Sequence, residues 1–172
     1  MSVLRRLVAG AAVIGVSTLM AGTAFAATQQ WDSSKKHYSI YSTNPGTTST
    51  YFTAPVGVDR LDTATAVDVV MTSYAQSGTP KDEYMRVCYT QPYGTNPIAC
   101  TDYFPGTNQV LSGDVIGMFE VIDSNGQTNN AAYSNISAKG DFTIDHYFPN
   151  GLNSPIYSDS GYDRVTVTYD EY

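Results

Sequence analysis

The chain has 172 residues, of which 15% are charged and 12% are aromatic, and its formal net charge is −7. An acidic protein repels nucleic acid and anionic membrane surfaces, so the composition argues against both as partners. The acidic residues are scattered and form no run typical of a disordered tail, which favours a solvated acidic surface that keeps an exported protein soluble.

The first 26 residues have the three parts of a secretory signal peptide. Arg5 and Arg6 form a positive start, residues 7–20 form an apolar segment rich in Gly and Ala, and residues 24–26 read Ala-Phe-Ala, the small residues that a signal peptidase requires. A membrane anchor is the alternative, because the apolar stretch approaches the length that spans a bilayer. Its Gly, Ser and Thr residues make it weakly hydrophobic. We therefore predict cleavage, export to the periplasm or the extracellular space, and no membrane insertion afterwards.

Cleavage would leave a mature chain of residues 27–172, which is 172 − 26 = 146 residues. Two of the nine basic residues leave with the signal peptide while all sixteen acidic residues remain, so the mature net charge is 7 − 16 = −9. This length suffices for one hydrophobic core. Because no internal repeat or linker is visible, we predict a single domain over residues 27–172.

The mature sequence predicts an all-β fold. Helical periodicity is almost absent, Thr, Tyr, Val and Ser dominate, and Gly, Pro, Asn and Asp interrupt the chain at short intervals. We predict an antiparallel β-sandwich of about eight strands. The expected strands are residues 38–42, 49–56, 64–74, 84–89, 98–103, 113–122, 131–137, 142–148 and 163–169.

The two cysteines lie on the two strands of a predicted hairpin over residues 84–103. Cys88 and Cys100 flank a loop that contains Pro and Gly, so pairing the strands places the two side chains opposite each other. Two unrelated buried thiols are the alternative. Because an exported protein reaches an oxidising compartment, we predict a disulfide, which would stabilise the fold by on the order of 3 kcal/mol.

The two histidines predict neither a catalytic nor a metal site. His146 follows Asp145 in a predicted strand, so their side chains point to opposite faces and cannot form a dyad. No nucleophile motif accompanies the serines, which argues against a hydrolase. His37 and His146 are far apart in the sequence and lack the spacing typical of zinc ligands. We therefore predict no catalytic residue, no cofactor and no metal.

Residues 123–126, Asp-Ser-Asn-Gly, are similar to the start of a calcium-binding loop. The glutamate that such a loop needs six residues after the glycine is replaced by Ala132. Asn-Gly readily adopts positive φ, so we predict a hairpin turn. Weak calcium binding by surface carboxylates stays open.

Fourteen tyrosines are the most unusual feature of the composition. In a strand, tyrosine fits a half-buried surface, and its flat ring with a polar tip also suits sugar- and protein-binding surfaces. Tyr89, Tyr93 and Tyr103, around the disulfide hairpin, are our predicted exposed binding patch. Trp31 is expected to fix the start of the mature chain against the sandwich.

Several features follow one another in a definite order along the chain. After the signal peptide come Trp31, an apolar strand at residues 67–74, a Gly-Thr-Pro turn at 78–80, and a strand at 86–88 that contains Cys88, whose partner is Cys100. The closing stretch matches best: Phe142, Phe-Pro-Asn-Gly-Leu at 148–152, Pro155, and Arg-Val-Thr-Val-Thr-Tyr at 164–169. In these features the chain resembles the FlhE family.

The resemblance implies a β-sandwich like those of carbohydrate-binding modules, with no catalytic residues. It also implies a periplasmic accessory role in flagellar assembly or export, with a protein partner at the basal body or the export apparatus. The alternative is a secreted carbohydrate- or surface-binding module that binds a polysaccharide through exposed tyrosines. Three exposed tyrosines in a row on one sheet face would favour this alternative.

Overall fold

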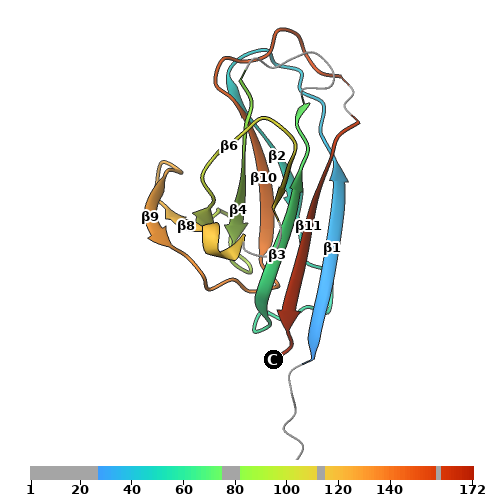
Figure 1. Cartoon of the computed structure of the whole chain (residues 1–172), viewed down its shortest axis with the longest axis vertical. Coiled ribbons are helices and arrows are strands. Elements are labelled where there is room, and N and C mark those ends of the chain that lie inside the picture. Colours follow the sequence, from blue (N-terminus) through green and yellow to red (C-terminus); the bar gives the residue numbers. More distant parts are fainter. Residues whose placement is uncertain (1–26, 75–81, 112–114, 158–159) are drawn as a thin grey trace, which may run out of the picture.

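The computed structural model describes residues 27–74, 82–111, 115–157 and 160–172. The predicted signal peptide, and the Gly-Thr-Pro turn at 78–80, lie outside these ranges. In the described part, eleven strands form two sheets in which every pairing is antiparallel, and the sheets pack face to face (Figure 1). The predicted antiparallel β-sandwich is confirmed. No helix among these residues is long and apolar enough to cross a membrane.

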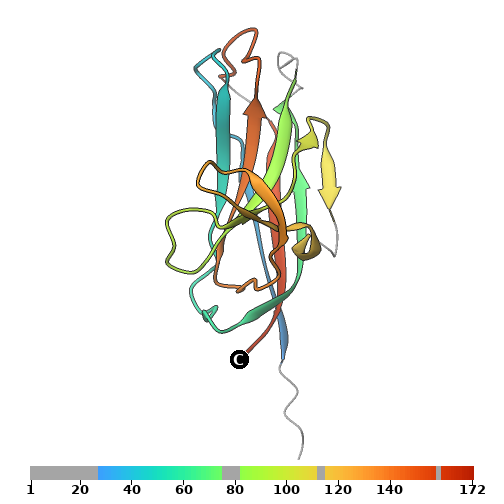
Figure 2. The same cartoon turned by 90° about the vertical axis from the view of Figure 1, so that its left-hand side faces the viewer.

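A four-stranded sheet and a seven-stranded sheet make up the sandwich. The smaller sheet has the order β1 (Thr28–Lys36), β11 (Tyr162–Asp170), β3 (Thr63–Met71) and β7 (Gln109–Leu111). The larger sheet has the order β2 (Gly46–Phe52), β10 (Asp141–Phe148), β4 (Tyr84–Thr90), β5 (Ala99–Cys100), β8 (Glu120–Ile122) and β9 (Thr128–Ala132), with β6 (Phe104–Pro105) also on β4. Figure 2 shows β2, β10 and β4 side by side.

Alternating side chains from both sheets build the core. Val67, Val69 and Met71 of β3 are almost fully buried, as the predicted alternation of this segment requires. They pack in one cluster with residues of β10 and β11, among them Ile144 and Val165. The strands with the clearest alternation in the sequence therefore lie at the centre of the two sheets.

The predicted disulfide is confirmed. Cys88 of β4 pairs directly with Cys100 of β5, their Cα atoms are 4.0 Å apart, and the two sulfur atoms are bonded. Both residues are buried. The bond fixes the register between β4 and β5, a strand of only two residues.

Trp31 holds β1 against the sandwich as predicted. Its side chain is 5% exposed, its Nε1–H donates to the carbonyl of Ala138 at 3.0 Å, and its ring packs against Phe142. The strand itself was not predicted, because Trp31 is its only buried residue and the alternation signal is absent. β1 is an edge strand that pairs along its whole length with β11.

Four expected strands differ from the structure, and the one expected at residues 98–103 is reduced to β5, Ala99–Cys100. Residues 38–42 contain only an isolated bridge between Ile40 and Ile156. In the segment 113–122, residues 116–118 form the 3-10 helix η2 and only 120–122 are a strand. The strand expected at 131–137 is β9, which ends at Ala132. Buried side chains such as Val115 and Phe119 imitate strand alternation here, although the backbone between them is helical.

Replacing both Cys88 and Cys100 by Ala should lower the free energy of unfolding by about 2–4 kcal/mol, because the unfolded chain regains the freedom that the closed loop removes. Urea denaturation of the oxidised protein and the double variant measures the difference. The variant should also be insensitive to reductant, whereas the parent should lose stability when reduced. An unchanged melting temperature would contradict this prediction.

Candidate functional site

The outer face of the seven-stranded sheet is polar and aromatic. In β2, β10 and β4 the side chains that do not enter the core point outward, and the register aligns them in rows across the three strands. The first row is Thr47, Tyr147 and Tyr84, the second is Ser49, Asp145 and Arg86, and the third is Tyr51, Thr143 and Cys88.

A groove with a volume of about 450 Å³ lies on this face. It is lined by β2, β10 and β4 and by the loop residues 94–97 that follow β4. Tyr51, whose ring is 58% exposed, lines it together with Ser49, Thr143 and Asp145. The groove thus combines one exposed aromatic ring with several hydroxyl and carboxylate groups, within the usual size range of small-molecule sites.

Arg86 and Asp145 form the fixed centre of the outer face. The Nε–H of Arg86 donates to Oδ2 of Asp145 at 3.1 Å, and the hydroxyl of Ser49 donates to Oδ1 at 2.7 Å. A further N–H of Arg86 donates to the carbonyl of Gly126 at 2.8 Å, which ties the turn at 123–126 to β4. Because the charges of Arg86 and Asp145 offset each other, this centre carries little net charge. Their mutual hydrogen bond fixes the orientation of both side chains.

Three further tyrosines stand beside this centre. Tyr84 and Tyr103 are 39% and 38% exposed, and the ring of Tyr103 lies 5.7 Å from that of Tyr147 and 4.7 Å from the guanidinium of Arg86. Burial raises the pKa of Tyr103, even though Arg86 lowers it, so its hydroxyl stays protonated and can donate a hydrogen bond. Of the four tyrosines on this face, Tyr51, Tyr84 and Tyr103 are exposed.

The predicted patch of Tyr89, Tyr93 and Tyr103 is only partly correct. Tyr103 is on the outer face and Tyr93 is 84% exposed, but Tyr89 is 1% exposed and the prediction for it is wrong. Alternation in β4 turns Tyr89 inward, where its ring packs on Phe142 and its hydroxyl accepts the N–H of Ser137 at 3.0 Å. The sequence argument missed Tyr51, Tyr84 and Tyr147, which the strand register could have placed on the outer face.

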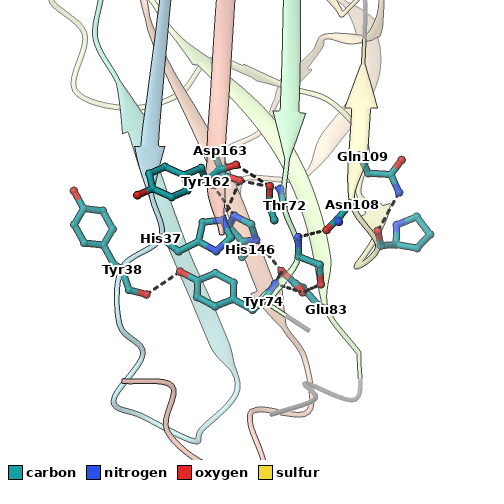
Figure 3. Close-up of polar contacts among 12 residues, drawn as sticks. His37, Tyr38, Thr72, Tyr74, Glu83, Asn108, Gln109, His146, Tyr162 and Asp163 are labelled. Carbon is teal, nitrogen blue, oxygen red and sulfur yellow. Dashed lines mark hydrogen bonds and ion pairs between the residues drawn. The ribbon is translucent and has the colours of Figure 1, made fainter. Parts of the chain in front are cut away.

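The inner side of the sandwich holds a second group of polar residues at one end of the core (Figure 3). His146 of β10 lies between two carboxylates: its Nδ1 is 2.8 Å from Oε1 of Glu83, and its Nε2 is 3.0 Å from Oδ2 of Asp163. Nε2 of His37 is 3.1 Å from the other oxygen of Asp163. We call Glu83, His146, Asp163 and His37 the buried ionic cluster.

Neighbouring groups hold the cluster in place. The backbone N–H of Thr72 donates to Oδ1 of Asp163 at 3.0 Å, while the hydroxyl of Ser73 and the backbone N–H of Tyr74 donate to Glu83. The ring of Tyr74 stacks on His37 with the centroids 4.3 Å apart. These partners come from both sheets, since residues 72–74 follow β3 and Glu83 precedes β4.

The cluster shifts the ionisation of its members. Burial alone would lower the pKa of His146, but hydrogen bonds with Asp163 and Glu83 outweigh burial and raise it to about 9. Burial alone would raise the pKa of Asp163, but hydrogen bonds with His146 and His37 hold it well below its usual range. At neutral pH, His146 is therefore an imidazolium between two carboxylates.

The fold brings together the two histidines, which are far apart in the sequence. Their rings lie 4.8 Å apart, and one ligand atom from each of His37, His146 and Asp163 lies within 4.8 Å of the others. Asp145, the sequence neighbour of His146, is on the opposite face, as predicted. The side chains of both histidines are fully buried, so this cluster presents no surface to a substrate.

The turn at residues 123–126 has the predicted form. The N–H of Gly126 donates to the carbonyl of Asp123 at 3.0 Å, and Gly126 has a φ of 76°. The Asp123 carboxylate accepts the backbone N–H groups of Asn125 and Gln127, which lowers its pKa. Its Oδ1 is thus engaged within the turn.

Comparison of the chain with protein-family models and with curated proteins finds no match.

The pH dependence of stability tests the ionisation of the cluster in protein kept free of metal by a chelator. Because the pKa of His146 rises from 6.5 to about 9 on folding, its contribution is complete below pH 6.5 and is lost as the pH rises to 9. Asp163, with a lowered pKa, contributes above its ordinary value of 3.8 and loses that contribution as the pH falls.

We therefore expect the greatest stability between about pH 4 and pH 6.5, and a loss of about 3 kcal/mol from pH 6.5 to pH 9. Urea unfolding at constant ionic strength measures the free energy of unfolding at each pH. Equal free energies of unfolding at pH 6.5 and pH 9 would show that His146 is neutral in the folded protein.

Proposed function

We propose that the protein is an exported, non-enzymatic binding protein that holds a neutral polysaccharide on the outer face of the seven-stranded sheet. The observation that carries this proposal is the groove of about 450 Å³, in which the exposed ring of Tyr51 stands beside hydroxyl and carboxylate groups. Tyr84 and Tyr103 extend the aromatic surface on the same face.

A polysaccharide matches the chemistry of this surface. The C–H faces of a sugar ring pack on a flat aromatic side chain, and its hydroxyls exchange hydrogen bonds with groups such as Ser49, Thr143 and Asp145. The net charge of residues 27–172, 7 − 16 = −9, disfavours an anionic polymer. The pairing of Asp145 with Arg86 leaves little charge in the groove to hold a cationic one, so we propose a neutral polymer. An open groove suits one stretch of a long chain better than an enclosed small molecule.

The spacing of the carboxylates that line the groove bears on whether this face could hydrolyse a glycosidic bond. The groove is lined by two carboxylates, Asp141 and Asp145, both on β10. They are four positions apart in the strand, which is about 13 Å along the backbone, whereas paired glycosidase carboxylates lie about 5–9.5 Å apart. Asp145 is also engaged by Arg86 and Ser49. These features support binding without catalysis.

A periplasmic accessory role in flagellar assembly or export is the second candidate. It is favoured by the FlhE-like order of features along the mature sequence, especially residues 142–169. In this case the outer face would contact a protein of the basal body or the export apparatus. The two candidates share export and the absence of catalysis, and they differ in the partner.

Retention on a panel of insoluble neutral polysaccharides tests the first candidate. Tyr51→Ala removes the exposed ring from the groove and should weaken retention about tenfold, because one aromatic contact contributes about 1–1.5 kcal/mol. Tyr157→Ala is the matched control, since Tyr157 is 69% exposed in the loop between β10 and β11 and packs against Tyr41. This control should bind like the parent.

A pull-down from periplasmic extract, run beside the panel, separates the candidates. Recovery of basal-body or export components without retention on any polysaccharide would replace the first proposal by the second. Equal retention of the parent and Tyr51→Ala would show that the groove is not the binding site.

A further inference from the structure

The buried ionic cluster brings together two imidazole nitrogens and a carboxylate that face one another in the core. Nε2 of His37 and Nε2 of His146 point at the two oxygens of Asp163, at 3.1 and 3.0 Å. Histidine nitrogens and a carboxylate oxygen are ligands that zinc accepts, at about 2.0–2.2 Å from the metal. A tetrahedral site places its ligand atoms about 3.4 Å apart. The two nitrogen–oxygen distances, 3.1 and 3.0 Å, would open slightly to reach this value, and all three ligand atoms already lie within 4.8 Å of one another.

The surroundings of the three side chains are those of a metal site. A histidine that binds zinc through one nitrogen typically donates its other ring N–H to a carboxylate, which fixes the ring. Nδ1 of His146 lies 2.8 Å from Oε1 of Glu83, so Glu83 is the carboxylate that would accept this second ring N–H. Glu83 is in turn held by Ser73, and Asp163 by the N–H of Thr72.

Charge gives a second, independent argument. Glu83 and Asp163 are two carboxyl groups whose side chains are at most 2% exposed, so both require positive partners inside the core. A divalent cation bound to two neutral histidines offsets both. A site of this composition thus reaches charge balance without a second buried proton.

We propose that His37, His146 and Asp163 form a structural zinc site, with Glu83 accepting the remaining ring N–H of His146. The ligands come from β10, from β11 and from the residue that follows β1, so the metal links the two sheets at one end of the sandwich. Because the ligands are buried, the role is to stabilise the fold, and a fourth donor is needed to complete the tetrahedron. This inference is independent of the groove and of the proposed polysaccharide.

The direct experiment uses the exported protein. The protein is unfolded in urea that contains a chelator, which removes any bound metal. It is then refolded with or without Zn²⁺, and gel filtration removes loosely bound metal. We expect one zinc per chain by elemental analysis, and a melting temperature about 5–10 °C higher than that of the metal-free protein. Refolding with Co²⁺ should give the intense visible absorption of a tetrahedral site.

Three variants locate the metal. His37→Gln removes a ligand and should reduce zinc affinity at least 100-fold, and Glu83→Gln should reduce it about 10- to 100-fold by loosening His146. Asp123→Asn removes an exposed carboxylate outside the cluster and should bind zinc like the parent. Affinities are measured by competition with a coloured chelator at pH 7.5.

The outcomes are decisive even where a buried variant fails to fold, because the stoichiometry and the Co²⁺ spectrum are measured on the unaltered chain. Refolded parent protein that retains no zinc would overturn the proposal. The cluster would then be held together by hydrogen bonds and ion pairs alone. Loss of zinc in Asp123→Asn, or equal stabilisation by Mg²⁺, would also overturn it, since either would indicate surface carboxylates as the ligands.

Discussion

The contact on which the sandwich depends most is the ionic bridge from Glu83 through His146 to Asp163. It joins the two sheets in a region where charges cannot be exposed to water, so every member requires its partners. Residues that follow β1 and β3 and one that precedes β4 converge on it, and it therefore determines how the strand ends meet. Removing one partner of a buried ion pair typically costs about 3–5 kcal/mol, whereas the loss of one methyl group from the hydrophobic core typically costs about 0.5–1.5 kcal/mol.

Strand β10 serves both sides of its sheet. Phe142, Ile144 and His146 point into the core, whereas Thr143 and Asp145 line the outer groove. Side chains that face the core and side chains that line the groove alternate along this strand, and the sheet separates the two sets. The register of β10 with β2 and β4 is therefore what aligns Tyr51, Asp145 and Arg86 on a single surface.

The parts of the fold that could be predicted are those in which local sequence and tertiary position agree. β3, β10 and β11 alternate clearly because each has one face in the core, and Cys88 and Cys100 lie opposite each other because of the hairpin. β1 has a single buried residue and carries no such signal. Residues 115–119 mislead for the opposite reason, since the buried side chains of Val115 and Phe119 flank the 3-10 helix η2 and not a strand.

The candidate sites were harder to predict because they depend on strands that are distant in sequence. Tyr51 and Arg86 meet only through the pairing of β2 and β4 with β10, and His37 meets His146 only when the sheets pack. A local signal did exist: His146 and Asp163 occupy inward positions of strongly alternating strands, where an unpaired polar residue would be costly. That cost implies a partner for each, although sequence alone does not identify it.

Fold and function must be argued separately for this chain. Many sandwiches bind sugars and many do not, so the architecture alone cannot choose between a polysaccharide and a flagellar protein. What distinguishes the two candidates is the character of the outer face. The groove places the exposed ring of Tyr51 beside the paired Arg86 and Asp145 and several hydroxyls, so one open surface provides both a flat ring for stacking and directional hydrogen bonds. Sugar rings require this combination along the length of a polysaccharide, and for that reason we favour a polysaccharide over a protein partner.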